Sequence, residues 1–230
     1  MNRGPIFTCS ICDQELLEKE STYVCSFCGN REQGEWACPN GHYTCEECRL
    51  AGPAEIIERV CQETRLCHPR EIAELLMRHP SFKDHGVEHH LLVAPVILVA
   101  LANANRIPVD KVKIQTALKR LVDIPIGVCG SRGDCGACVG AGAAVSLISG
   151  MYGNPKSARK WALKATGRAL LHLAEMEGAR CCKQSVYAAL ETCTRILQEE
   201  MGIPLEIGGA IKCGFSHKIT DCKKEECHYY

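Results

Sequence analysis

The sequence has few aromatic residues and no excess of charge of either sign. Phe, Trp and Tyr make up 5% of the 230 residues, and 27 Lys and Arg balance 27 Asp and Glu. Proteins that bind nucleic acid usually carry a basic patch, and those that bind single strands also carry aromatic side chains on which bases stack. The composition therefore argues against nucleic acid as a partner.

The sequence also lacks a long hydrophobic run. The longest, Leu91 to Ala102, contains Pro95, is too short to span a bilayer, and is typical of a buried helix. Met1 to Ser10 has no apolar segment of the kind found in secretory signals. We therefore expect a cytoplasmic protein with no membrane contact. Because the cytosol is reducing, its 18 cysteines are expected to bind metal or to remain thiols.

Four pairs of metal-ligand residues follow one another in the first fifty positions: Cys9 and Cys12, Cys25 and Cys28, Cys38 and His42, Cys45 and Cys48. Two or three intervening residues let both members of a pair reach one Zn²⁺ ion, and eight ligands complete two tetrahedral sites. Either neighbouring pairs share an ion, or the pairs cross, first with third and second with fourth. Since the segment has too few apolar residues for a core, we predict a zinc-binding module over residues 1–52.

This module is acidic, with four Arg or Lys against Asp13 and seven Glu. Closed tetrahedral sites leave no coordination position for a substrate. We therefore expect the module to contact a protein partner or to be purely architectural.

From Pro53 onward the pattern changes to amphipathic helices. Pro53, Pro69 and Asn154-Pro155 suit helix starts, and Gly178 and Gly202 suit helix ends. We predict an all-α domain over residues 53–230, with a glycine- and cysteine-rich loop and a cysteine-rich tail, so that the chain is mainly α. Helices are expected over 54–65, 70–79, 85–105, 111–122, 139–149, 156–177 and 182–201, and one short strand over 205–207.

The loop holds Cys129, Cys135 and Cys138 among glycines. Its C-x5-C-x2-C spacing is one residue longer than the C-x4-C-x2-C of plant-type ferredoxins. Cys181 or Cys182 is the candidate fourth ligand, because both stand at a predicted helix start, where the dipole favours thiolates. If helix 139–149 runs away from the loop and helix 156–177 runs back, Cys181 and Cys182 return to the three loop cysteines. We predict an iron–sulfur cluster or reactive thiolates here, with buried packing thiols as the alternative.

The other cysteines divide by pattern. Cys61 and Cys193 fall on apolar helical stripes and are expected in the core. The tail carries Cys213, Cys222 and Cys227, whose spacing fits no single zinc knuckle. These three can complete the loop cluster, bind a metal of their own, or hold a second iron–sulfur centre.

A histidine-rich segment, His85-Gly-Val-Glu88-His89-His90, precedes the apolar run. On a helix, His85 and His89 would share a face, and Glu88 could orient an imidazole or act as a base. We take Glu88, His89 and His90 as candidate catalytic residues. The alternative is a polar helix start with surface histidines.

The chain resembles an uncharacterised cysteine-rich family of unknown function, found mainly in anaerobic bacteria and methanogenic archaea. The resemblance rests on His85-x3-His89-His90, on Cys129 to Gly142, on Cys181-Cys182-Lys183, and on the end near Cys222 and Cys227, and covers most of the chain from about residue 36. It supplies no activity, but an anaerobic setting suits oxygen-sensitive iron–sulfur chemistry.

These observations favour a protein of redox or sulfur metabolism that binds Zn²⁺ and an iron–sulfur cluster. The alternative is a zinc-stabilised adaptor that binds a protein partner and whose cysteines are all structural. The sequence names no small-molecule substrate, no oligomeric state and no reaction.

Overall fold

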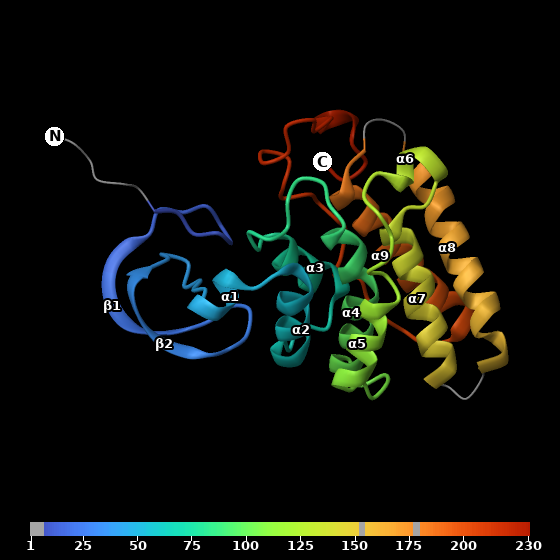
Figure 1. Ribbon diagram of the computed structural model, residues 1–230, viewed down its shortest axis with the longest axis horizontal. Coiled ribbons are helices and arrows are strands. Elements are labelled where there is room, and N and C mark those ends of the chain that lie inside the picture. The colour runs from blue at the N-terminus through green and yellow to red at the C-terminus, as the bar shows by residue number, and fades with distance from the viewer. Residues whose placement is uncertain (1–6, 152–154, 177–179) are drawn as a thin grey trace.

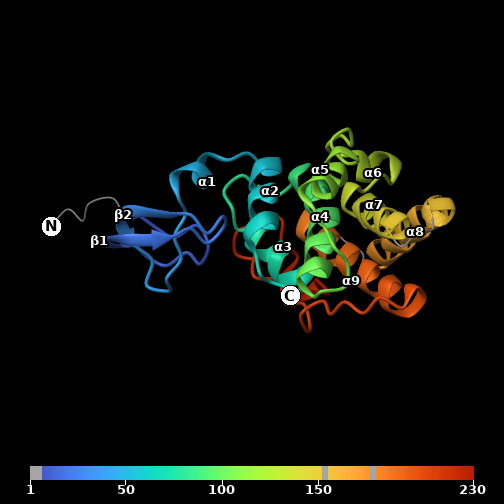
Figure 2. The ribbon, with the colours of Figure 1, turned by 90° about the horizontal axis from the view of Figure 1, so that it is seen from below.

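Helices form most of the chain, as its sequence pattern predicts. The computed structural model describes residues 7–151, 155–176 and 180–230. A two-stranded antiparallel sheet and a short helix stand at one end of an elongated molecule, and the remaining helices pack side by side beyond them (Figures 1 and 2). The elements are β1 (Leu17–Val24), β2 (Arg31–Ala37), α1 (Glu46–Leu50), α2 (Pro53–Glu63), α3 (Pro69–Met77), α4 (Glu88–Asn103), α5 (Lys111–Lys119), α6 (Val128–Arg132), α7 (Gly136–Met151), α8 (Ala158–Ala174) and α9 (Cys182–Met201), with single 3₁₀ turns at Pro155–Ser157 and Lys224–Glu226.

Helix α4 forms the centre of the helical part. Every residue from Glu88 to Leu101 is buried, and the helix contacts α2, α3, α5, α7 and α9. A helix that is apolar all round must be enclosed by others to be stable in water. Pro95 lies inside α4 without ending it. The apolar run therefore builds the core rather than a membrane segment, and no helix among the described residues is long and apolar enough to cross a bilayer.

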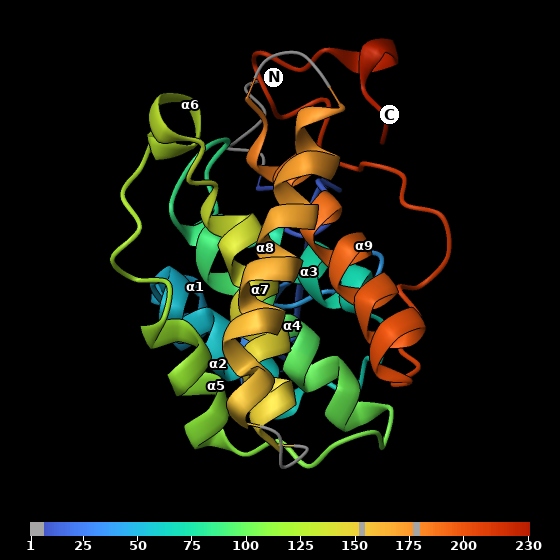
Figure 3. The same cartoon turned by 90° about the vertical axis from the view of Figure 1, so that its right-hand side faces the viewer.

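Helix α7 uses glycines to approach its neighbours closely. A Cβ atom at Gly136 would lie 2.2 Å from His90 Cγ of α4, and one at Gly142 would lie 2.6 Å from the Ala162 carbonyl oxygen of α8. Both separations are shorter than real contacts, so only glycine fits at these positions. Helices α7 and α8 form an antiparallel hairpin, and α9 packs against both (Figure 3). This hairpin is the outward-and-return path that the sequence analysis required.

The N-terminal module is attached to the helical part through the end of α3. Arg78 Nη1 donates to the Ile11 carbonyl at 2.7 Å, and His79 Nε2 lies 2.7 Å from the Cys48 carbonyl oxygen. The Arg78 guanidinium also lies over the Phe215 ring at 5.4 Å. One arginine thus joins the module to the C-terminal tail.

At both ends of the chain the secondary structure differs from the prediction. Residues 205–207 form no strand, although the Ile207 carbonyl accepts the Arg70 N–H at 3.2 Å, so this segment lies along α3 without a β partner. The hairpin β1–β2 was not predicted. Its strands are largely exposed on both faces, so the alternation of apolar and polar residues that signals a strand is missing.

The cysteine-bearing segments of the helical part gather at one end. Helix α6, the start of α9 and the C-terminal tail all lie at the same end of the helical bundle (Figures 1 and 3). The α7–α8 hairpin brings this about, since it returns the chain to the level at which α7 begins.

Candidate metal centres and thiol groups

The eight N-terminal ligand residues form two compact groups. One contains Cys9, Cys12, Cys38 and His42, and the other contains Cys25, Cys28, Cys45 and Cys48. Within each group the ligand atoms all lie within 4.8 Å of one another. Tetrahedral zinc with Zn–S bonds of about 2.3 Å requires ligand atoms about 3.8 Å apart.

The individual distances agree with that requirement. Cys12 Sγ lies 3.5 Å from Cys38 Sγ, and His42 Nδ1 lies 3.7 Å from Cys38 Sγ and 3.8 Å from Cys9 Sγ. In the second group, Cys28 Sγ lies 3.6 Å from Cys45 Sγ. Donor sets of three thiols with one imidazole, and of four thiols, are those of closed structural zinc sites. Both groups could hold a metal ion of the zinc kind.

The pairs cross along the chain, first with third and second with fourth. The crossed pattern was one of the two left open by the spacing. It arises because the second pair stands in the turn between β1 and β2. The antiparallel strands bring the first and third pairs together at the open end of the hairpin, where Leu17 pairs with Ala37, and leave the second pair to the fourth. Neither group can assemble from a single contiguous stretch, so the two sites and the hairpin are expected to form together.

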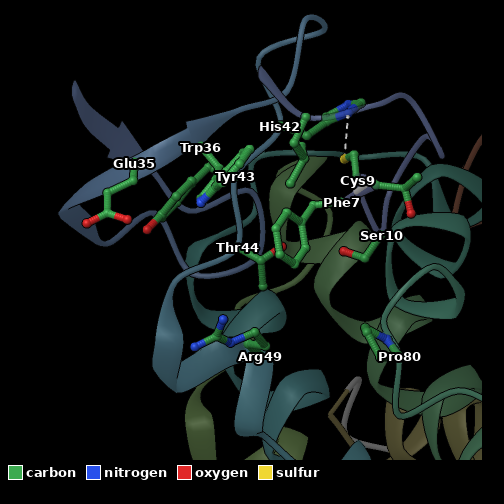
Figure 4. A pocket seen from close by; sticks show the side chains of 12 residues that line it. Phe7, Cys9, Ser10, Glu35, Trp36, His42, Tyr43, Thr44, Arg49 and Pro80 are labelled. Atoms are coloured by element: carbon green, nitrogen blue, oxygen red, sulfur yellow. Dashed lines mark hydrogen bonds between the residues drawn. The ribbon is translucent and has the colours of Figure 1, made fainter. Parts of the chain in front are cut away.

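The module also encloses a cavity of about 440 Å³ beside the first group. Figure 4 shows it between Phe7, Trp36, Tyr43 and the loop at Pro80, with His42 and Cys9 at one side. The Phe7 and Trp36 rings are 4.9 Å apart, and both side chains remain partly exposed.

At the end of the helical bundle where α6 and the start of α9 lie, four thiols from three segments form what we call the loop thiol group: Cys129 on α6, Cys135 and Cys138 around the start of α7, and Cys182 at the start of α9. The Cys135 thiol is hydrogen-bonded to Cys138 and Ser185 and interacts electrostatically with Cys182, and Cys138 interacts with Cys129. The structure thus brings α7 and α9 together at their N-termini, as expected.

The surroundings of the loop thiol group shift the pKa values of its thiols in different directions. The hydrogen bond from the Cys138 thiol lowers the pKa of Cys135 to about 5, although burial opposes this. The same hydrogen bond, together with burial, raises the pKa of Cys138. Burial raises the pKa of the Cys182 thiol. The Gly86 N–H, which donates to the Cys182 sulfur, acts in the opposite direction and lowers this pKa. Cys135 is therefore more readily ionised than Cys138 or Cys182.

A second set, the tail thiol group, consists of Cys181, Cys213, Cys222 and Cys227. All four line one small cavity together with Gln184, Tyr187 and Tyr229. The Cys213 thiol interacts electrostatically with Cys181, Cys222 and Cys227. The structure therefore assigns the tail cysteines a place with Cys181, and not with the loop thiol group.

Backbone N–H groups point at the sulfurs in both thiol groups. In the N-terminal module, Cys9 and Cys25 accept from the N–H groups two and three residues later. Cys135 and Cys181 show this same pattern. Cys213 Sγ accepts the backbone N–H of Phe215, and Cys222 Sγ accepts that of Lys224, each two residues later and at 3.4 Å. Cys38 Sγ accepts the Asn40 N–H in the same way.

The core cysteines provide a contrast. Cys61 and Cys193 are buried in the hydrophobic core, as their stripes predicted. Burial is the main cause that raises the pKa of both thiols, and no backbone N–H contributes. Donation from successive N–H groups stabilises a thiolate, so this pattern separates ligand-like cysteines from packing cysteines.

All three candidate catalytic residues are buried rather than on the surface, and His90 lies against the loop thiol group at Gly136 and Cys135. Glu88 is 6% exposed, His89 0% and His90 7%. Burial raises the pKa of Glu88, but its contacts with His89 and the Lys83 N–H outweigh this and bring it to about 2. His89 Nδ1 lies 3.5 Å from Glu88 Oε1. Burial lowers the pKa of both histidines, which favours the neutral form of each imidazole.

Two imidazole nitrogens of this set have no hydrogen-bond partner within the described structure, His89 Nε2 and His90 Nδ1. Buried polar atoms without a partner cost free energy, and where they occur in a folded protein they require an explanation. His90 packs on Gly136, directly beside Cys135, and its charge interaction with that thiol is among the causes acting on its pKa.

One expectation for this segment was wrong. Helix α4 begins at Glu88, so His85 precedes it and does not share a helical face with His89. Residues 83–87 instead form a loop over the start of α9, held there by the Gly86 N–H on Cys182 and by the Lys183 ammonium, which donates to the Lys83 and Asp84 carbonyls.

Gln184 is a functional candidate that sequence reasoning missed, and Lys183, which the sequence analysis named only within Cys181-Cys182-Lys183, is a second. Lys183 is only 3% exposed and Gln184 only 4%, and Gln184 Nε2 has no partner in the described structure. Burial lowers the pKa of Lys183, while Asp84 and the neighbouring thiols raise it. No local pattern marks them, since Lys, Gln and Ser directly after Cys182 look like an ordinary polar first turn, and only the structure shows that this turn is buried.

Comparison with protein-family models gives one match. Residues 57–230 match a model described as a family of unknown function, DUF5714. The chain belongs to this family. The match begins later than residue 36, so the eight zinc-type ligands lie outside it, whereas both thiol groups and Glu88, His89 and His90 lie within it. Among curated proteins and among solved structures, none matches the chain.

Proposed function

We propose that this DUF5714 member is a redox protein, or a protein of sulfur metabolism, in an anaerobic cell, with zinc in its N-terminal module and an iron–sulfur cluster on the loop thiol group. One observation carries the proposal. Four thiols from α6, α7 and α9 converge, and the buried His90 interacts with one of them, Cys135, while the buried Glu88 and His89 precede it on α4. A purely structural zinc site needs no buried imidazoles with unpartnered nitrogens at its side.

The donor chemistry supports a cluster rather than a single ion. In the part of the chain that the structure describes, the groups of three or more ligand atoms that all lie within 4.8 Å are the two N-terminal ones. The loop thiols are spaced more widely than one zinc ion requires. Thiolates bound to different irons of one cluster suit the wider spacing, and four cysteines are the usual ligands of such clusters.

The surrounding residues have separate roles in this proposal. The buried Lys183 ammonium interacts favourably with Cys181 and Cys182 and would offset the negative charge of thiolates. The Gly86 carbonyl oxygen, 3.3 Å from His89 Nδ1, and the Glu88 carboxylate, 3.5 Å from it, fix the orientation of the His89 ring. His89 Nε2 and His90 Nδ1 are then available to hydrogen-bond to a thiolate, a sulfide or a small substrate at the site. A cluster bound here would supply one-electron chemistry or a Lewis-acidic iron.

A reductive titration under anaerobic conditions tests the redox function. The full chain should show an absorption band near ~400 nm that is bleached by dithionite and restored by reoxidation. Cys138→Ser should lose much of this reversible change, while Cys193→Ser, in the core, should keep it. A wild-type chain that contains iron but takes up no electrons would contradict the redox proposal.

A second function, the zinc-stabilised adaptor, is favoured by a different observation. The cavity of Figure 4 has aromatic walls formed by Phe7, Trp36 and Tyr43, of which Phe7 and Trp36 stay exposed. Partly exposed aromatic side chains around a concave site are typical of protein-binding surfaces. Zinc as the sole metal in anaerobically purified protein, with no acid-labile sulfide, would favour this function over the first.

A further inference from the structure

The C-terminal tail closes on itself with little secondary structure to hold it. Between residues 213 and 230, one 3₁₀ turn is the only helical element, and Phe215, Ile219 and Tyr229 are the buried apolar side chains. The Cys213 N–H donates to the Tyr229 carbonyl at 2.6 Å, and Tyr229 Oη donates to Glu191 of α9 at 2.7 Å. Ordering this many residues costs more than three buried side chains return. A bound metal commonly supplies the difference in such segments.

The tail thiols have the features of ligands. Cys213 and Cys222 accept backbone N–H groups in the geometry found at Cys38 of the N-terminal module, and Cys181 accepts two, as Cys9 does. Their thiols line one cavity with Cys227. The packing cysteines Cys61 and Cys193 lack this pattern.

A buried polar atom also faces this cavity. Gln184 lines it, is 4% exposed, and its Nε2 has no partner in the described structure. An amide N–H₂ group is a donor, so the missing partner is an acceptor such as a thiolate or an inorganic sulfide. This observation is independent of the cysteines, and an electron-rich group bound in the cavity would supply the missing acceptor.

We propose that Cys181, Cys213, Cys222 and Cys227 form a second four-thiolate site, separate from the loop thiol group, which binds its own iron–sulfur cluster. The inference rests on the proposed function in that it takes the same kind of cofactor. Since these thiols too fall outside the groups with ligand atoms within 4.8 Å, a cluster fits their spacing better than one zinc ion. Cys181 and Cys182 are consecutive, so the two sites are neighbours along the backbone.

The test is iron and acid-labile sulfide per chain after anaerobic reconstitution of the full-length protein with ferrous iron and sulfide. Cys222→Ser and Cys135→Ser should each lower both contents by about half, and the double variant should lose nearly all of them. Cys67→Ser, outside both groups, is the matched control and should match wild type. Zinc should stay unchanged in all four.

The possible failures can be told apart. Full iron in Cys222→Ser would overturn the second site and leave the loop site standing. Loss of zinc in place of iron would overturn the assignment of a cluster to the tail. Wild-type protein that takes up no iron would overturn both sites and the proposed function. If Cys222→Ser misfolds, trypsin gives a second measurement: cleavage at Lys223 and Lys224 should be slow in the iron-loaded wild type and fast after iron removal, and equal rates would contradict the proposal.

Discussion

Cys181 and Cys182 are adjacent in the chain, yet their thiols belong to different groups. Cys181 lines the cavity of the tail thiol group with Cys213, Cys222 and Cys227, whereas Cys182 accepts the Gly86 N–H and interacts with Cys135. Cys181 is the N-cap residue of α9 and Cys182 its first helical residue, so the turn into the helix directs the two side chains apart. A vicinal pair at this position connects the two groups through one peptide bond.

This division predicts a specific pattern of additivity. Cys181→Ser combined with Cys222→Ser should lose no more iron than either single variant, because both changes disable one site. Cys182→Ser combined with Cys222→Ser should lose nearly all, because the sites are different. Iron analysis of the four variants is the measurement. If the Cys181 and Cys182 variants behave alike in combination with Cys222→Ser, the two thiols share one site.

The crossed arrangement of the N-terminal module predicts that its two zinc sites depend on each other. The wild type should hold about two zinc ions per chain, and Cys25→Ser should lose at least one of them and make residues 7–50 sensitive to protease. Zinc analysis and limited proteolysis measure this, with Cys61→Ser as a control outside the module. Full zinc content together with unchanged protease resistance would show that Cys25 is not a ligand.

The contact between Gly136 and His90 predicts opposite effects of one substitution at two glycines. Gly136→Ala should destabilise the protein by about 1–3 kcal/mol, because its Cβ would overlap the His90 ring. Gly167→Ala, inside α8 with no atom within 4 Å of the new Cβ, should stabilise it by about 0.5–1 kcal/mol. Urea unfolding under anaerobic conditions gives both values. Equal effects at the two positions would contradict the described packing of α4 on α7.

The unpartnered nitrogens of His89 and His90 predict an effect on the site rather than on folding. Replacing either histidine by Gln should leave the thermal midpoint nearly unchanged and alter the reduction potential or metal content of the loop site. His172→Gln, on α8 and outside the loop thiol group, serves as the control, since its imidazole pairs with Glu191 at 3.1 Å. A stability loss of about 1–3 kcal/mol with unchanged metal content and potential would mark both as core residues.

Much of the helical part could be predicted because its helices carry clear start and stop signals. Pro53 and Pro69 open α2 and α3, Asp110 caps α5 through the Lys113 N–H, and Gly202 ends α9 in the left-handed conformation. The start of α4 was missed, because the loop at residues 83–87 is fixed by distant contacts from α9 that no local pattern reveals.

The ligand set of the N-terminal module could also be predicted, but the pairing within it could not. Knuckle spacing specifies which two residues act together and says nothing about which pairs share an ion. The division of the other cysteines between the loop thiol group and the tail thiol group could not be predicted from spacing either. It depends on which way two consecutive side chains point from the first turn of α9, which is a property of the packed structure.

The most direct test of the account is the metal and sulfide content of the full chain purified without oxygen. We expect about two zinc ions per chain together with iron, acid-labile sulfide in proportion to the iron, and a broad absorption band near ~400 nm. Zinc without iron and without labile sulfide, after both anaerobic purification and reconstitution, would contradict it.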